Sequence, residues 1–241
     1  MNSRRTLISL ACGMAAMALF PRAGLAENLF ANPGFETVVA TTGSWPTDVG
    51  YWRGDYSAIV TASDGIAPLE GTHMLKFIYS GSADPSDAGG CELMQVVDLT
   101  SMAGLISQGG AAAVAAASFN RVDGDSETDR AFGVELRAYA GDANTFATQY
   151  QNGDELAVDY DQISTDGDTD TWEGASIELP LPVTTGFVAV RLWASENVYN
   201  DLTGVEFDGH YGDATSLVVI PEPGALALLV LGGLGLVRRR R

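Results

Sequence analysis

Cysteine and histidine are scarce in this chain, which has two of each among its 241 residues. Cys12 lies in an apolar stretch near the N-terminus, so Cys91 is the only cysteine in the rest of the chain. A lone cysteine cannot form an intramolecular disulfide, so the fold must be held by its core or by its core together with a metal ion. The sequence also lacks an HExxH pair, a GxSxG nucleophile elbow and a phosphate-binding loop. We therefore expect a protein that is not an enzyme.

Basic residues are scarce between Glu27 and Ile220. This part of the chain has six basic and 30 acidic residues and a net charge of −24, whereas the whole chain carries −18 because the other arginines lie near its two ends. An acidic surface repels nucleic acid and anionic lipid, and it attracts divalent cations. We expect no nucleic-acid partner.

Long amphipathic helices are absent from the pattern as well. Short period-2 runs, separated by Gly, Asp and Pro clusters, are typical of half-buried strands. They predict strands over residues 57–62, 73–79, 92–99, 112–120, 130–140, 146–150, 175–179, 187–194 and 214–220, with a short helix over 100–108. Alanines 111–117 favour a helix by propensity, but the Asp/Gly turn and strand that follow them favour a β-hairpin. The pattern predicts one all-β domain, a β-sandwich over residues 27–220.

The N-terminus has the pattern of a signal peptide over residues 1–26. Arg4 and Arg5 precede an apolar run, and Gly24 and Ala26 supply small residues near the expected cleavage point after Ala26. The paired arginines also suit twin-arginine export, so the general secretory and twin-arginine routes both stay open.

The C-terminal segment, 221–241, combines three kinds of sequence. Its first residues, whose prolines disfavour regular structure, are Pro221, Glu222 and Pro223. The apolar run 224–237 would form a helix about 21 Å long, shorter than the ~30 Å hydrocarbon core of a membrane. The chain then ends in four arginines, a charge typical of a cytoplasmic end: Arg238, Arg239, Arg240 and Arg241.

This order of elements resembles the PEP-CTERM sorting signal of Gram-negative bacteria. The resemblance implies that the export machinery carries the chain across the inner membrane, that the short apolar helix 224–237 is held there transiently as a transmembrane segment, and that an exosortase cuts the tail. The protein would then reside at the cell surface or outside the cell. The alternatives are an ordinary tail anchor and a last strand with a basic end.

Segments of the central domain resemble, in order, the galactose-binding-like jelly roll found in many carbohydrate-binding modules. They are residues 28–36, 70–77, 95–99, 171–182, 188–194 and 213–217. The resemblance implies a jelly-roll β-sandwich, a fold that sugar binders share with adhesion domains and accessory enzyme domains, so it does not decide the function. In this family Trp172 and Trp193 align with positions that are usually structural.

The same resemblance implies a structural Ca²⁺ site, with Glu36 and Asp213 as ligands where the first and last strands meet. Ala214 departs from the pattern, because the family usually has Asp or Asn there. Two acidic runs, 123–129 and 166–170, are alternative calcium sites, since they place carboxylates at every second position. Solvated acidic turns are the favoured explanation of these two runs.

Aromatic residues cluster early in the domain, at Tyr51, Trp52 and Tyr56. Flat apolar rings stack well on pyranose faces, so these three residues are predicted to form a sugar-binding platform. The alternative is that they belong to the core of the sandwich.

We interpret the chain as an exported, non-catalytic carbohydrate-binding or structural protein of the cell surface or extracellular matrix. One alternative is a secreted polysaccharide hydrolase or an accessory subunit, which would need a convergent acid–base pair in a cleft. The other is a structural surface protein without a ligand.

Replacing Pro221 and Pro223 together with alanine is expected to leave the tail uncut and the precursor in the inner membrane. The reason is that the rigid junction directly before a short apolar span would be lost. Membrane fractionation and intact mass measure the outcome, and normal processing and release of the double variant would contradict it.

Overall fold

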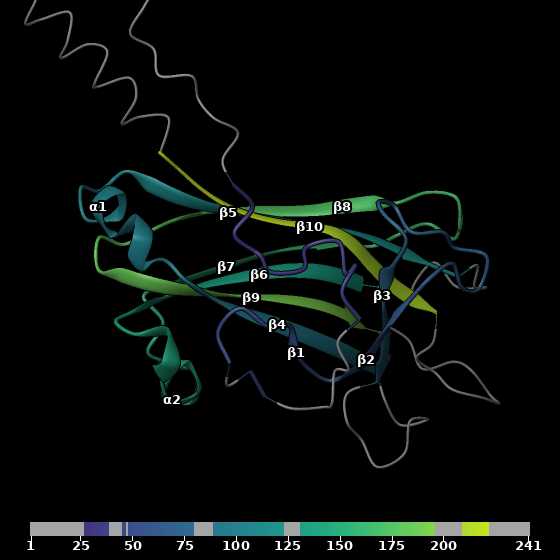
Figure 1. The fold of residues 1–241 in the computed structure, drawn as a ribbon, viewed down its shortest axis with the longest axis horizontal. Helices are drawn as coiled ribbons and strands as arrows, with labels where there is room; N and C mark the ends of the chain where they lie inside the picture. The colour runs from purple at the N-terminus through teal and green to yellow at the C-terminus, as the bar shows by residue number, and fades with distance from the viewer. Residues whose placement is uncertain are drawn as a thin grey trace, which may run out of the picture.

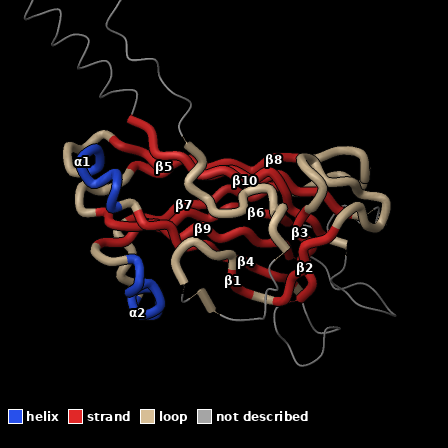
Figure 2. The backbone as a smooth tube through the Cα atoms, viewed as in Figure 1, coloured by secondary structure: helices blue, strands red, loops and turns tan. Residues whose placement is uncertain are grey.

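The computed structural model describes residues 27–38, 45–46, 48–79, 89–122, 131–195 and 209–221. These residues form two antiparallel five-stranded sheets that face each other (Figures 1 and 2). Sheet A has the strand order β1 (Arg53–Gly54), β4 (Gly90–Asp98), β9 (Thr185–Ser195), β6 (Ala131–Ala140) and β7 (Ala157–Ile163). Sheet B has the order β2 (Tyr56–Val60), β3 (Met74–Tyr79), β10 (His210–Pro221), β5 (Ala111–Arg121) and β8 (Glu173–Pro180).

The strand pairs are nested, as in a long hairpin that has been rolled up. The innermost pair is β6 with β7, followed outward by β5 with β8, β4 with β9 and β3 with β10. Successive pairs alternate between the two sheets, and the sheets are completed where β9 pairs with β6 and β10 with β5. This is the strand order of a jelly roll, to which β1 and β2 are added at the sheet edges. The predicted all-β jelly-roll sandwich is confirmed.

The two-residue period of each strand decides which side chains form the core. In β9, the core takes four residues at alternate positions, Val188, Val190, Leu192 and Ala194. The intervening Arg191 and Trp193 therefore point to the outer face of sheet A. The same alternation in β6 buries Phe132, Val134 and Leu136 between the sheets.

The alanine-rich segment forms the strand β5, as predicted. It lies inside sheet B between β10 and β8, and Ala111, Ala113 and Ala115 are completely buried against the opposite sheet. Pairing on both edges satisfies its backbone groups, and the small side chains allow close packing. These gains override the helix propensity of alanine.

The predicted short helix after β4 is confirmed as the 3₁₀ turn η2 (Thr100–Met102) followed by α1 (Ala103–Ile106). The predicted strand over 146–150 is wrong, because the chain forms the 3₁₀ turn η3 (Ala143–Thr145) and the helix α2 (Phe146–Asn152) there. Asp142 accepts the N–H of Asn144 at the start, and Gly153 ends the helix with a left-handed φ of 71°. Such local caps favour a helix, whatever the strand-like composition.

Strand β7 was not predicted from the sequence. It lies at the edge of sheet A, where only one of its edges is paired. Most of its side chains are exposed or half-buried, so its hydrophobic alternation is weak. Edge strands often carry polar residues, which makes them hard to recognise from a pattern.

The N-terminal segment 27–38 is tied to the last strand. The N–H of Leu29 donates to the carbonyl of Leu217 over 2.8 Å, and the side chain of Asn28 bonds the backbone of Thr215 and Leu217. Further along β10, the buried carboxylate of Asp213 accepts the N–H groups of Leu69 and Glu70 over 2.8 and 3.2 Å, and that of Ala214 over 2.7 Å. Asp213 therefore joins the turn before β3 to the last strand.

Replacing Asp213 with alanine is expected to lower the free energy of unfolding by about 2 to 4 kcal/mol, because three N–H groups lose their common acceptor. Burial raises the pKa of Asp213. Asparagine keeps one of its two acceptor oxygens, either the one for Leu69 and Glu70 or the one for Ala214. Asp213→Asn is the matched control and is expected to lose less than half as much. Urea unfolding in the presence of a chelator measures the free energy of unfolding of both variants. Equal stability of Asp213→Ala and wild type would contradict the role given to this carboxylate.

Candidate functional site

The two predicted calcium ligands, Glu36 and Asp213, contact the same turn, residues 69–73, but each already accepts hydrogen bonds from its N–H groups. The carboxylate of Glu36 accepts the N–H groups of Thr72 and His73 over 2.7 and 3.0 Å, and the Thr72 hydroxyl over 2.8 Å. The hydrogen bonds from Thr72 and then His73 lower the pKa of Glu36 to about 2. Asp213 is placed within β10, not before the last strand as expected, and Glu36 follows a segment that is not a strand.

This donor set does not present the open group of oxygen ligands that calcium needs. Within the described ranges, no three His, Cys, Asp or Glu side chains are grouped closely enough to hold a metal ion. At the alternative run 166–170, Asp166 and Asp168 accept N–H groups of their own turn over 2.9 and 3.1 Å, and the run 123–129 lies outside the described residues. Calcium binding stays a prediction. If calcium binds here, wild type melts at a higher temperature in calcium than in chelator, and Asp213→Ala does not.

The three predicted platform aromatics are separated by the structure. Trp52 is only 7% exposed and packs against Phe30 and Phe35, with ring centroids 4.9 and 5.7 Å away. Tyr51 is 53% exposed, and the guanidinium of Arg53 lies 5.5 Å from its ring centroid. Tyr56 starts β2 in the other sheet. Trp52 therefore belongs to the core, the alternative that the sequence left open, and the three rings do not share one exposed surface.

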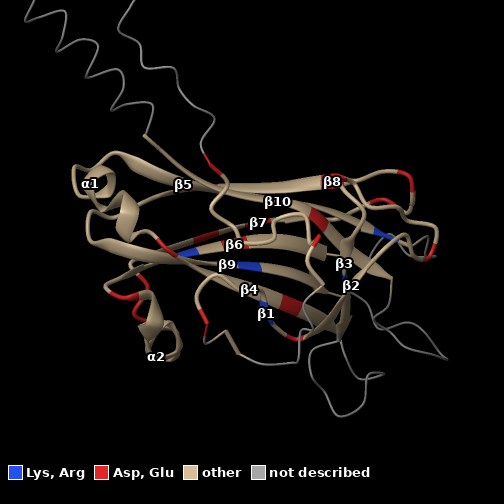
Figure 3. Ribbon diagram, in the orientation of Figure 1, with Lys and Arg blue, Asp and Glu red and all other residues tan. Residues whose placement is uncertain are grey.

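The outer face of sheet A brings together groups that the sequence keeps apart. One row across the sheet contains Glu92, Trp193, Gly133 and Gln162, from β4, β9, β6 and β7. The next row contains Met94, Arg191, Glu135 and Tyr160 from the same strands. Figure 3 shows the acidic segment on β4 and the basic segment on β9 beside each other in this sheet. We call these two rows the sheet A face.

Ion pairs hold the charged side chains of the sheet A face. Arg191 donates to Glu92 and to Glu135, each over 2.7 Å. The other oxygen of Glu135 accepts from Arg137 over 2.6 Å, and Arg137 also reaches Glu155 over 3.3 Å. Glu135 is 5% exposed, so these charge-assisted hydrogen bonds are partly shielded from water and fix the side chains.

Trp193 lies across Gly133. A Cβ atom at Gly133 would collide with three neighbouring atoms of the indole, Cε2, Cζ2 and Nε1. Because Cε2 is a ring-fusion atom bonded to the other two, a point close to all three lies over the ring plane. One face of the indole therefore rests on Gly133, and the half-buried side chain presents its other face outward.

The helix α2 covers one end of the outer face and leaves the other end open. Phe146 of α2 packs with Met94, Val96, Tyr139 and Phe187, so that end forms a second apolar cluster. Figure 1 shows α2 on the side of sheet A that faces away from sheet B. At the open end, an open depression of about 560 Å³ is lined by residues that include Glu92, Arg191 and Trp193. Tyr160, on the neighbouring edge strand, is 62% exposed.

The sequence did not single out Trp193 as a candidate site residue, because the family resemblance assigns this tryptophan a structural position. The alternation of side chains along β9 was the available signal. Trp193 points to the same side of the strand as Arg191 and to the opposite side from Leu192. Its partner Gly133 could not be found this way, because the pairing of β9 with β6 is set by the fold.

Of the sorting residues, only Pro221 is described, as the last residue of β10, paired with Ala111. The remaining residues of the signal and the predicted signal peptide, 1–26, lie outside the described residues. None of the helices in the described ranges is long and apolar enough to span a membrane.

No curated protein matches the chain. Among solved structures, the family 16 carbohydrate-binding module 2 is similar over 79% of this chain and 99% of its own, with 14% identity and a TM-score of 0.46. The CBM22-1 xylan-binding domain of Paenibacillus barcinonensis Xyn10C is similar over 81% of this chain and 96% of its own, with 11% identity and a TM-score of 0.44. An enzymatically active domain of the bacteriophage CBA120 tailspike protein 4 has 11% identity and a TM-score of 0.45, and this chain spans 21% of its length.

The C-terminus itself matches a family model. Residues 219–241 match the PEP-CTERM protein-sorting motif, which confirms the resemblance drawn from the tail. The chain carries a PEP-CTERM sorting signal and is therefore exported across the inner membrane, to reside at the cell surface or outside the cell after processing.

Proposed function

We propose that the exported protein binds polysaccharide on the sheet A face without acting on it chemically, and that it serves in the extracellular matrix or at the cell surface. The observation that carries the proposal is the Trp193 indole, which rests on Gly133 and turns its other face outward beside the ion pairs of Arg191. The jelly-roll fold is compatible with this role but does not decide it.

The chemistry of the sheet A face suits a sugar. The C–H groups of a pyranose pack on an aromatic ring, and its hydroxyl groups form hydrogen bonds with charged side chains. Trp193 and the exposed ring of Tyr160 supply the aromatic surface, and Glu92 and Arg191 supply the polar groups. Most of the acidic residues in the described ranges lie in the loops around the sheets (Figure 3). Their repulsion disfavours polyanions, so we expect a neutral polysaccharide.

The carboxylates of this face are not arranged as an acid–base pair. Both oxygens of Glu135 are bound to Arg137 and Arg191, and its side chain is buried. Glu92 is also paired with Arg191. These contacts support a role for both carboxylates in holding the arginine in place.

Trp193→Ala is expected to weaken binding of neutral polysaccharide about tenfold, equivalent to about 1.4 kcal/mol, because the stacking surface is lost. Gly133→Ala tests the same ring without removing it: the added methyl group displaces the indole and is expected to weaken binding several-fold. Affinity electrophoresis over a panel of plant and bacterial polysaccharides, followed by titration calorimetry, measures the effect on the exported protein.

Tyr56→Ala is the matched control, since Tyr56 is a partly exposed aromatic residue in the other sheet. It is expected to bind like wild type. If Tyr56→Ala or Tyr51→Ala weakens binding and Trp193→Ala does not, the sugar lies at the aromatic residues first predicted. If no polysaccharide binds wild type, the protein is structural, and new reducing ends in the polysaccharide would indicate a hydrolase.

A further inference from the structure

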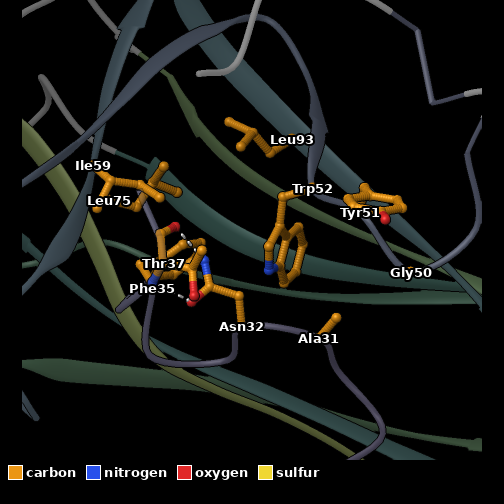
Figure 4. Close-up of a pocket in the computed structure, with 10 residues that line it drawn as sticks. All are labelled: Ala31, Asn32, Phe35, Thr37, Gly50, Tyr51, Trp52, Ile59, Leu75 and Leu93. Carbon is orange, nitrogen blue, oxygen red and sulfur yellow. Dashed lines mark hydrogen bonds between the residues drawn. The ribbon is translucent and has the colours of Figure 1, made fainter. Parts of the chain in front are cut away.

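A partly open, mainly apolar cavity of about 240 Å³ lies at the edge of the sandwich, and none of its lining residues belongs to the sheet A face. The N-terminal segment, the residues before β1 and the strands β2, β3 and β4 all contribute to its wall (Figure 4). The apolar part of the wall includes Phe35, Trp52, Ile59, Leu75 and Leu93. Exposed Tyr51 also lines the cavity and marks its outer side.

Trp52 brings a polar group into this apolar wall. The side chain is 7% exposed, and its Nε1–H is buried without a hydrogen-bond acceptor in the part of the chain that the structure describes. Figure 4 shows the nitrogen edge of the indole on the side of Asn32 and Phe35, two other residues of the wall. A buried N–H group without a partner is unfavourable by about 1 to 3 kcal/mol, so tryptophan at such a place usually has an acceptor.

Asn32 does not accept from Trp52 in the structure, and its amide bonds Thr37 instead. Its Nδ2 donates to the carbonyl of Thr37 over 2.9 Å, and its Oδ1 accepts the N–H of Thr37 over 2.8 Å. These bonds close the loop 32–37 across the cavity wall. Among the described residues, Trp52 Nε1–H thus stays available to a molecule that enters the cavity.

The backbone of this loop is held in an unfavourable conformation. Asn32 and Phe35 both have a φ of 54°, and this left-handed region is uncommon for asparagine and rare for a bulky residue such as phenylalanine. Strained residues of this kind persist where the surroundings fix them, and they are frequent at ligand sites. Here the strain places the Phe35 ring in the cavity wall beside Trp52.

We propose that the cavity binds a small, mainly apolar molecule that carries one hydrogen-bond acceptor, and that this acceptor bonds Trp52 Nε1–H. A water-sized group occupies about 30 Å³, so the cavity holds roughly eight non-hydrogen atoms, the size of an aromatic ketone or a short acyl group. This site is independent of polysaccharide binding, because it shares no residue with the sheet A face.

Two isosteric probes test the proposal on the exported protein. Acetophenone has a carbonyl oxygen, and cumene has a methyl group in its place. Acetophenone is expected to bind about three- to tenfold more tightly than cumene, the effect of one hydrogen bond. In ¹H–¹⁵N spectra, acetophenone should shift the indole N–H signal of Trp52 downfield and leave the other tryptophan signals in place. Trp52→Phe assigns that signal and is expected to bind both probes equally.

Equal affinities of wild type for the two probes, or no shift of the Trp52 signal at saturating acetophenone, would overturn the proposal. If Trp52→Phe fails to fold, the affinities of wild type for acetophenone and cumene still test the proposal. Their effects on its melting temperature report the same difference, since a ligand that binds only the native state stabilises it. Trp193→Ala is the matched control and is expected to keep the preference for acetophenone.

Discussion

The pairing of the last strand, β10, inside sheet B is the constraint on which the rest of the structure depends. β10 pairs with β3 on one edge and β5 on the other, so without it sheet B would fall into two parts with unpaired backbone groups. The N-terminal segment is bonded to β10 at Leu217, and the turn before β3 is bonded to it at Asp213. The strand ends at Pro221, and the sorting motif begins at residue 219, so the fold and the motif share three residues. The sandwich is therefore complete only when the chain extends into the sorting motif.

Sheet A is organised around a different interaction, the ion-pair chain that runs from Glu92 through Arg191 and Glu135 to Arg137. A buried glutamate needs such partners, because an unpaired charge there would be strongly destabilising. The pairs also hold their side chains in fixed positions on rigid strands, which suits a binding surface. Helix α2 covers the apolar end of the same face, and the polar end with Trp193 stays open.

The cavity beside Trp52 arises where the jelly roll has its shortest strands. β1 has two residues and β2 has five, so the sandwich edge between the two sheets is incomplete there. The N-terminal segment covers part of this edge with Phe30 and Phe35, and its two left-handed residues allow it to bend over the opening. The result is a small apolar space, whereas the sheet A face is open and charged.

The sequence by itself determined the features that depend on local pattern. The tail shows its export signal in a contiguous order of prolines, apolar residues and arginines, and the period-2 runs indicate the strands of an all-β domain. Parity within β9 already separates Arg191 and Trp193 from the core residues. Local caps at Asp142 and Gly153 were also readable, although the strand-like composition between them was misleading.

Only the tertiary structure decided that Trp52 is buried and that the Trp193 ring lies across Gly133. Trp52 and Trp193 have similar neighbours in the sequence, since each has an arginine within two residues, Arg53 and Arg191. Trp52 is buried because Phe30 and Phe35 fold over it, and Trp193 turns a face outward because a glycine lies opposite it on β6. Both outcomes depend on contacts between distant parts of the chain. Whether a ring is exposed depends on the distant residues that the fold packs against it. A local sequence pattern does not identify these residues.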